Sequence, residues 1–352
     1  MTASATVQPG RTTPAEELSG DRSFTWFTPA RRKPSEYESY TVGQQSGPDQ
    51  WLHIDWPVRF DDGRPPWSDE SSAVRTTTWR DYRDPAAMWQ RPFVSTTNQD
   101  QQALARMVPV LTGGSANATC PSWSKEVLGR TYAAWPFVEY GLFLALSYGV
   151  RQAMSDTVQF SVVFQAADRL RLLQDIVFHL DALSEDCPEF SDGGARGAWL
   201  TDPTLVPIRE IVEHLVACED WVEALVVATL VFEPLLGRLA KAELFSRRAA
   251  LAGDGTTPAV LAGSLRDTAR HIDAVIELVR LVCADPEHGA ANRAAIEGWV
   301  QSWGVRCVEA ARAFLPAFTA AGVPDAERDA ALTRTTAVQR DVLVAALGRA
   351  QR

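Results

Sequence analysis

Apolar residues recur at helical spacing along most of the chain from Asn98 onward, and this part of the sequence shows no alternating, strand-like pattern. The clearest example is the stretch from Asp156 to Leu183, in which apolar residues three or four positions apart fall on one stripe of a helix of about eight turns. The stripe consists of Val158, Val162, Ala166, Leu170, Leu173, Val177 and Leu180. The pattern predicts an all-α protein.

Further helices are predicted around this one, separated by loops that contain glycine, proline and aspartate. Their expected ranges are 100–111, a helix through 139–150 that Pro136 kinks or restarts, 205–245 with Pro234 as a point of interruption, 259–283, 292–318 and 326–350. Long helices joined in pairs by short loops indicate a four-helix bundle with accessory helices. A helical repeat protein is the alternative, although the sequence lacks a self-similar period of roughly 30 to 45 residues.

The front of the chain, from Arg31 to Phe93, has a different pattern, in which proline and glycine recur too often for a long helix. Half of the chain's 12 tryptophans lie on this stretch or at its edge, namely Trp26, Trp51, Trp56, Trp67, Trp79 and Trp89. Because burial of an indole is a large hydrophobic gain, these side chains need a surface to pack against. We expect an arm that wraps a partner through the last five of them. The alternative is an arm that packs on its own body.

These patterns divide the chain into three regions. Residues 1–23 mix both charges without an apolar segment, which predicts a disordered tail and not a signal peptide. Residues 24–97 form the extended arm rich in tryptophan and proline, and residues 98–352 form the helical domain with its C-terminal accessory helices. The most apolar run, from Trp221 to Leu236, is shorter than a membrane span and contains charged residues, so we expect a buried helix there.

The composition of the chain limits which kinds of partner it can bind and in which cellular compartment we expect it. A formal net charge of -10 and a pI near 5.1 argue against binding to nucleic acid, whose phosphates would repel this surface. The five cysteines are widely spaced and form no C-x-x-C pair, so they indicate neither a disulfide framework nor a structural zinc site. We expect reduced thiols in a cytoplasmic protein that contacts neither membrane nor nucleic acid.

Three motifs in the arm carry a resemblance to a known family: RRKPSEYE from Arg31, DGR from Asp62, and RDP-x-x-x-W-x-R from Arg83. In this order they resemble the beta subunit of the hydroxylase component of soluble di-iron multicomponent monooxygenases, which oxidise methane, alkenes, propane, phenol and toluene. The resemblance covers Phe24 to about Phe318. It favours a ferritin-like bundle of the ribonucleotide-reductase type over a helical repeat.

The resemblance also implies partners and cofactors. A separate alpha subunit would hold the di-iron centre, a reductase would supply electrons from NADH, and a small coupling protein would regulate turnover. The subunits would assemble as an αβ dimer of dimers, or with an additional small gamma subunit. No cofactor is expected in this chain.

The metal ligands of such bundles are a glutamate on each of two helices and an E-x-x-H motif on each of the other two. This sequence contains no E-x-x-H. Placed on this chain, the family's ligand pattern keeps its first glutamate at Glu139. Its first E-x-x-H falls on Arg169 and Leu172, and its third-helix glutamate falls on Ala228, or on Glu223 in another register. Its second E-x-x-H falls on Thr268 and His271. We therefore expect no metal and no catalytic residue in this chain.

A buried carboxylate without its metal needs another counter-charge. We expect Arg169 to pair with Glu139 across the helix pair, the alternative being that Arg169 points into water. His271 is expected to be an ordinary core histidine. Asp168 and Arg171, three residues apart, are expected to form a structural pair on one helix face.

The sequence thus predicts a non-catalytic, structural beta subunit of an NADH-dependent monooxygenase that acts on small hydrocarbons. By resemblance, epoxidation of short alkenes is the expected reaction, and a propane, phenol or toluene type is the alternative. A free-standing helical metalloenzyme with an atypical site at Glu139, Glu223 and His271 is a second reading, and a helical adaptor is a third. Neither nucleotide-binding glycine motifs nor a serine nucleophile motif is present.

Overall fold

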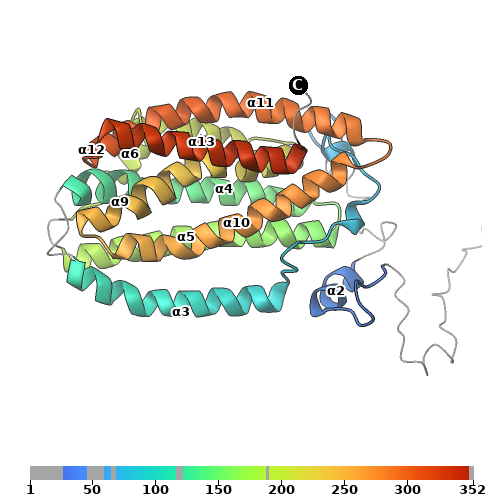
Figure 1. Ribbon diagram of the computed structural model, residues 1–352, viewed down its shortest axis with the longest axis horizontal. Helices are drawn as coiled ribbons and strands as arrows, with labels where there is room; N and C mark the ends of the chain where they lie inside the picture. The colour runs from blue at the N-terminus through green and yellow to red at the C-terminus, as the bar shows by residue number, and fades with distance from the viewer. Residues whose placement is uncertain (1–26, 46–58, 65–68, 116–121, 188–189, 349–352) are drawn as a thin grey trace, which may run out of the picture.

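The computed structural model describes residues 27–45, 59–64, 69–115, 122–187 and 190–348. Within these ranges all regular secondary structure is helical, as the hydrophobic pattern predicts (Figure 1). In the same ranges, none of the helices combines the length and the apolar character that crossing a membrane requires.

Four long helical segments form the central bundle. The first two make an antiparallel hairpin, and the third contains two π-helical segments. In order they are α4 (Ala133–Gln152), α5 (Asp156–Asp186), the continuous run α8 (Trp221–Val226), η6 (Val227–Gly237) and η7 (Leu239–Ser246), and α10 (Thr256–Cys283). Helix α4 packs along α5 and against α8, and α10 packs against α5, η6 and η7. This is the four-helix bundle that the sequence pattern indicates.

The third core helix contains two of the π-helical segments of the protein, η6 and η7, and a third π segment, η5 (Trp123–Tyr132), precedes α4. Pro234 lies inside η6. A proline cannot donate the backbone hydrogen bond of an α-helix and clashes with the preceding turn. The helix nevertheless does not end at this predicted point of interruption, and its π winding begins earlier, at Val227, and continues through Pro234.

Accessory helices surround the bundle (Figure 1). They are α3 (Gln90–Ser115), α6 (Ala195–Thr201), α7 (Val206–Val216), α9 (Arg247–Ala249), η8 (Ala250–Ala252), α11 (Gly289–Phe314), α12 (Pro316–Ala320) and α13 (Asp325–Leu347). Three boundaries differ clearly from the expected ones. The helix expected over 205–245 is broken at 217–220, where α7 ends and Asp220 caps the start of α8. Helix α3 begins ten residues earlier than the hydrophobic pattern indicates, since its first turns are polar. The helix expected over 292–318 divides at Pro316, whose ring suits the first turn of a new helix.

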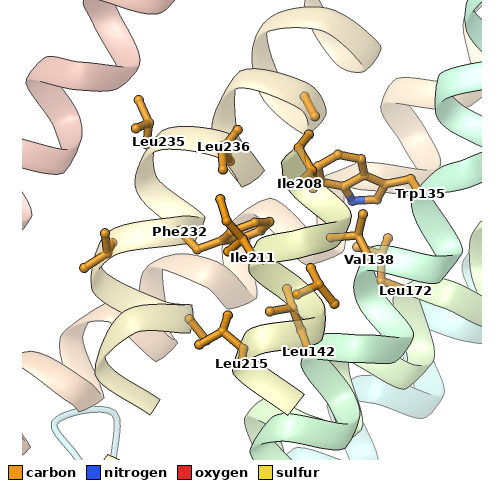
Figure 2. Close-up of a cluster of buried hydrophobic side chains, with 14 of the residues drawn as sticks. Trp135, Val138, Leu142, Leu172, Ile208, Ile211, Leu215, Phe232, Leu235 and Leu236 are labelled. Atoms are coloured by element: carbon orange, nitrogen blue, oxygen red, sulfur yellow. The ribbon is translucent and has the colours of Figure 1, made fainter. Parts of the chain in front are cut away.

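One cluster of buried hydrophobic side chains is formed by α4, α7 and η6, with a contribution from α5. Figure 2 shows Trp135, Val138 and Leu142 facing Ile208, Ile211, Leu215, Leu172, Phe232, Leu235 and Leu236. Each of these side chains is at most 3% exposed. A Cβ atom on Gly141 would lie 2.1 Å from Val212 Cγ1, so only glycine at this position allows α4 and α7 to approach so closely.

The described parts of the arm are partly helical and contact the bundle. They contain α2 (Glu36–Tyr40), η1 (Val42–Gln44), η3 (Asp69–Ser71) and η4 (Trp79–Asp81). Trp79 was expected at a partner interface, but it is 5% exposed and its ring centroid lies 5.5 Å from that of Trp221 in this chain. Trp89 is half-buried and stacks on Tyr40 at 4.9 Å. Trp51, Trp56 and Trp67, and the expected tail over 1–23, lie outside the described residues.

Candidate functional site: a buried ion quartet

Four charged side chains meet in the centre of the bundle, where a ferritin-like protein would hold its metals. Glu139 comes from α4, Arg169 from α5, Glu233 from η6 and Lys241 from η7. None of them is more than 5% exposed. We call these four residues the ion quartet.

Each carboxylate of the ion quartet contacts both cations. Arg169 Nη1 donates to Glu139 Oε2 at 3.1 Å and to Glu233 Oε2 at 2.6 Å. Lys241 Nζ lies 2.6 Å from Glu233 Oε1 and 3.5 Å from Glu139 Oε1. Two negative and two positive charges therefore give a formal charge of zero, which is the condition under which ionised groups remain stable in a protein core.

Two neutral donors complete the site. Trp135 Nε1 donates to Glu139 Oε1 at 2.8 Å, and Thr268 Oγ1 donates to Glu233 Oε1 at 3.3 Å. Thr268 is the residue on which the family pattern places a ligand glutamate, so the structure brings that position to the site. Hydrogen bonds to a charged acceptor are stronger than those between neutral groups, and both orient the carboxylates.

The predicted pair between Arg169 and Glu139 is confirmed, and the alternative in which Arg169 points into water is wrong. Ala228, on which the family pattern places the third-helix ligand, is an apolar core residue, and Glu223 of the alternative register accepts a hydrogen bond from Trp303 Nε1 at 2.7 Å. The carboxylate that the third core helix brings to the site is Glu233, which the sequence pattern did not single out as a site residue. Sequence reasoning also missed Lys241. The sequence does contain an indication of its role, because a lysine within the long apolar segment 205–245 is expected to be buried, and a buried charge must be paired inside the fold.

His271 lies beside the ion quartet in a second buried network and is a satisfied core histidine, as expected. Its Nε2 atom lies 2.9 Å from Asp168 Oδ2, and Asp168 also accepts from Arg171 at 3.1 Å. Burial lowers the pKa of His271, although the Asp168 carboxylate acts in the opposite direction. The predicted pair of Asp168 and Arg171 is real, but it is buried and extends through Asp267. Leu172 belongs to the hydrophobic core.

The donor set does not fit a di-iron centre. Two iron ions require several carboxylates and imidazoles with free lone pairs that converge on them. Glu139 and Glu233 already accept bonds from Arg169 and Lys241, and the imidazole of His271 is bound to Asp168. An arginine side chain remains charged at any working pH and repels metal cations.

The charges of the ion quartet reinforce one another. Burial alone would raise the pKa of Glu233, but the nearby Arg169 and Lys241 side chains outweigh this effect and lower it to about 2. Burial would likewise lower the pKa of Arg169, yet the Glu233 and Glu139 carboxylates raise it. Both shifts favour the ionised forms, so the fold is linked to the protonation state of Glu233.

This linkage predicts a pH dependence of stability. Because the pKa of Glu233 is about 2 in the fold and near 4.5 in an unfolded chain, its ionised form stabilises the fold above pH 4.5. The contribution, on the order of 3 kcal/mol, disappears as the pH falls through about 2. We expect the destabilisation caused by Glu233→Gln to be large at pH 7 and to shrink at acid pH, measured by urea unfolding. Glu210→Gln on an exposed helix face is the control, and an equal effect of both substitutions at all pH values would contradict the linkage.

Comparison with known proteins agrees with this architecture. The family model described as Methane/Phenol/Alkene Hydroxylase matches residues 56–286. The chain is 32% identical over 303 residues to the small subunit of the hydroxylase component of propane 2-monooxygenase from Rhodococcus jostii, with 85% of this chain and 81% of that one covered. It is 32% identical over 315 residues to the beta chain of component A of methane monooxygenase from Methylosinus trichosporium, with 86% and 79% covered.

Two solved structures share the fold. A structure of toluene 4-monooxygenase with toluene in its resting active site matches with a TM-score of 0.69 at 21% identity, covering 89% of this chain and 99% of that one. A structure of phenol hydroxylase from Pseudomonas sp. OX1 matches with a TM-score of 0.73 at 16% identity, covering 97% and 98%. The fold is therefore the ferritin-like one. The chain belongs to the methane, phenol and alkene hydroxylase family and is a small (beta) subunit of the hydroxylase component of an NADH-dependent bacterial multicomponent monooxygenase.

Proposed function

We propose that this chain is the non-catalytic, structural subunit of its hydroxylase and scaffolds an alpha subunit that carries the di-iron centre. The observation that carries the proposal is the ion quartet, because Arg169 and Lys241 satisfy the two central carboxylates that metals would otherwise need. The second reading, a metalloenzyme using Glu139, Glu223 and His271, finds no support, since these three residues have separate partners.

The proposed substrate is a short aliphatic hydrocarbon, oxidised in the alpha subunit. Epoxidation of short alkenes remains the first reaction to assay. A second candidate is propane hydroxylation, which is supported by 32% identity to the propane 2-monooxygenase small subunit. Identity falls to 23% for the beta subunit of toluene-4-monooxygenase and to 26% for the phenol 2-monooxygenase chain from Pseudomonas sp., which makes aromatic substrates the weaker choice.

The remaining components of the proposal concern assembly. The alpha subunit, with or without a gamma subunit, would bind this chain permanently, and a reductase and a coupling protein would act on the complex. Trp51, Trp56 and Trp67 of the arm are proposed to contact alpha. A cytoplasmic location is supported by the free thiols of Cys187, Cys218, Cys283 and Cys307 in the described part of the chain.

Iron counting on the purified chain, with and without its alpha subunit, tests the proposal. We expect negligible iron on this chain alone and about two irons per alpha subunit after co-expression and purification through a tag on this chain. The control is alpha expressed alone and reconstituted with iron. Stoichiometric iron on the isolated chain, or failure of alpha to purify with it, would refute the structural role. The purified complex is then assayed with propene and propane.

A further inference from the structure

The central part of the hairpin of α4 and α5 has its charges inside and its apolar side chains outside, which is the reverse of a helix that faces water, whereas exposed charges occur only toward its ends, for example at Arg151, Asp181 and Glu185. From Ala133 to Val150 on α4, every residue that is not buried is uncharged, and so is every such residue from Gln159 to Leu173 on α5. The charged residues within these two ranges, which are Glu139, Asp168, Arg169 and Arg171, are all buried. The outer surface of this hairpin is therefore built to face something other than solvent.

The exposed side chains of the hairpin are large and partly aromatic. Phe137, Tyr140 and Leu144 on α4 are 36%, 48% and 38% exposed, and Phe178 on α5 is 40% exposed. At about 100° of rotation per residue, Phe137 and Leu144 lie on the side of α4 away from Glu139, Tyr140 lies at the edge of that side, and Phe178 lies opposite Arg169 on α5. Helices α6 and α7 flank this side of α4 through Trp199, which stacks on Phe137, and Val212, which lies against Gly141. We call this surface the outer hairpin face.

The accessory helix α11 shows the contrast. The exposed residues of α11 include Glu297, Arg306, Glu309 and Arg312, which is the pattern of a helix in water. The chain thus has charged side chains available and places them on one side of the molecule. Depletion of charge with enrichment of aromatic residues is typical of the core of a protein interface.

We propose that the outer hairpin face is the docking surface for a complementary apolar helical face of the alpha subunit; this inference rests on the proposed function. Helices of this length present a surface roughly 25 Å long, and two adjacent helices are roughly 20 Å wide. Covering it would bury roughly 1,000 Å² over both partners, which reaches the lower range of specific interfaces before the arm is added. A second copy of this chain is disfavoured as the occupant, because each copy carries a formal net charge of -10.

Charge insertion tests the surface. Tyr140→Glu and Tyr140→Lys place a charge of either sign at a half-exposed position that the isolated fold does not need. We expect both to weaken binding of alpha by at least ~30-fold, because a charge in a closed interface is desolvated without a partner. Val305→Glu on α11, where Val305 is 58% exposed, is the matched control and should leave the affinity unchanged. Binding is measured by sedimentation with purified alpha, and circular dichroism checks the fold of each variant.

The outcomes separate this inference from the proposed function. If the wild-type chain does not bind alpha, the proposed function fails; if wild-type and both Tyr140 variants bind alpha equally, only the docking surface is wrong. Loss of a homodimer without loss of alpha binding would also overturn it, in favour of a second copy. Should a variant fail to fold, hydroxyl-radical footprinting of the wild-type complex decides. Protection of Phe137, Tyr140 and Phe178 by alpha is expected, with Val305 still reactive, and unprotected aromatic residues would overturn the proposal.

Discussion

Replacing Arg169 with methionine is expected to lower the free energy of unfolding by about 3 to 5 kcal/mol. The guanidinium is the group that bonds both Glu139 and Glu233, and its loss leaves the core with one uncompensated negative charge. Urea unfolding at pH 7 measures the effect. Arg340→Met is the control, because Arg340 and Asp341 are 72% exposed and a surface pair contributes less than about 1 kcal/mol.

A second variant distinguishes charge from packing. Adding Glu139→Gln to Arg169→Met restores a neutral core, so part of the lost stability should return. If the double variant is as unstable as the sum of the single ones, the guanidinium acts through its volume and not through its charge. If Arg169→Met behaves like Arg340→Met, the ion quartet has no structural role.

Replacing Gly237 with alanine is expected to cost about 3 kcal/mol, through the same site. A Cβ atom there would lie 2.6 Å from Cδ and from both carboxylate oxygens of Glu233. The carboxylate would have to leave its bonds to Arg169 and Lys241 to make room. Thermal and urea unfolding measure the loss. In a Glu233→Ala background the added cost should largely vanish, as a double-mutant cycle would show.

The control for Gly237→Ala is Gly298→Ala on α11. An added Cβ atom at Gly298 has no neighbour within 4 Å, and alanine is the better helix former by about 1 kcal/mol. The control should therefore be neutral or stabilising. Destabilisation of both variants to the same extent would show that backbone conformation, and not the displaced carboxylate, sets the effect at Gly237.

Much of the bundle follows from the sequence, because helices with a periodic apolar stripe are specified locally. The stripe on α5 predicts its start and all but its last three residues, and Glu139 and Arg169 could be paired because both lie on regularly wound α-helices. The start of α3 could not be predicted, since its first turns are polar and only contacts such as the stacking of Phe93 on Phe164 hold it.

The third core helix shows where sequence reasoning reaches its limit. Counting back from Phe232 and Pro234 places the family's ligand pattern on Ala228, or on Glu223 in another register, and a pattern of letters does not reveal that η6 and η7 have a wider π winding. A change of winding rotates all later residues about the helix axis, so Glu233 and Lys241 reach the site instead. Trp79 is a different case, because the sequence of the arm shows only that its indoles need cover and not which surface provides it.

All four charges of the ion quartet are carried by side chains of the chain itself and not by a bound metal ion. This affects when the subunit can fold. A bundle that depends on a metal ion for charge balance reaches its final folded state only after the metal binds. The amount of folded protein then depends on the amount of iron available. Here Arg169 and Lys241 are present as soon as the chain is synthesised. In the proposed assembly, the subunit would fold first, with a stability that is independent of iron concentration, and offer a finished surface on which the metal-dependent alpha subunit matures.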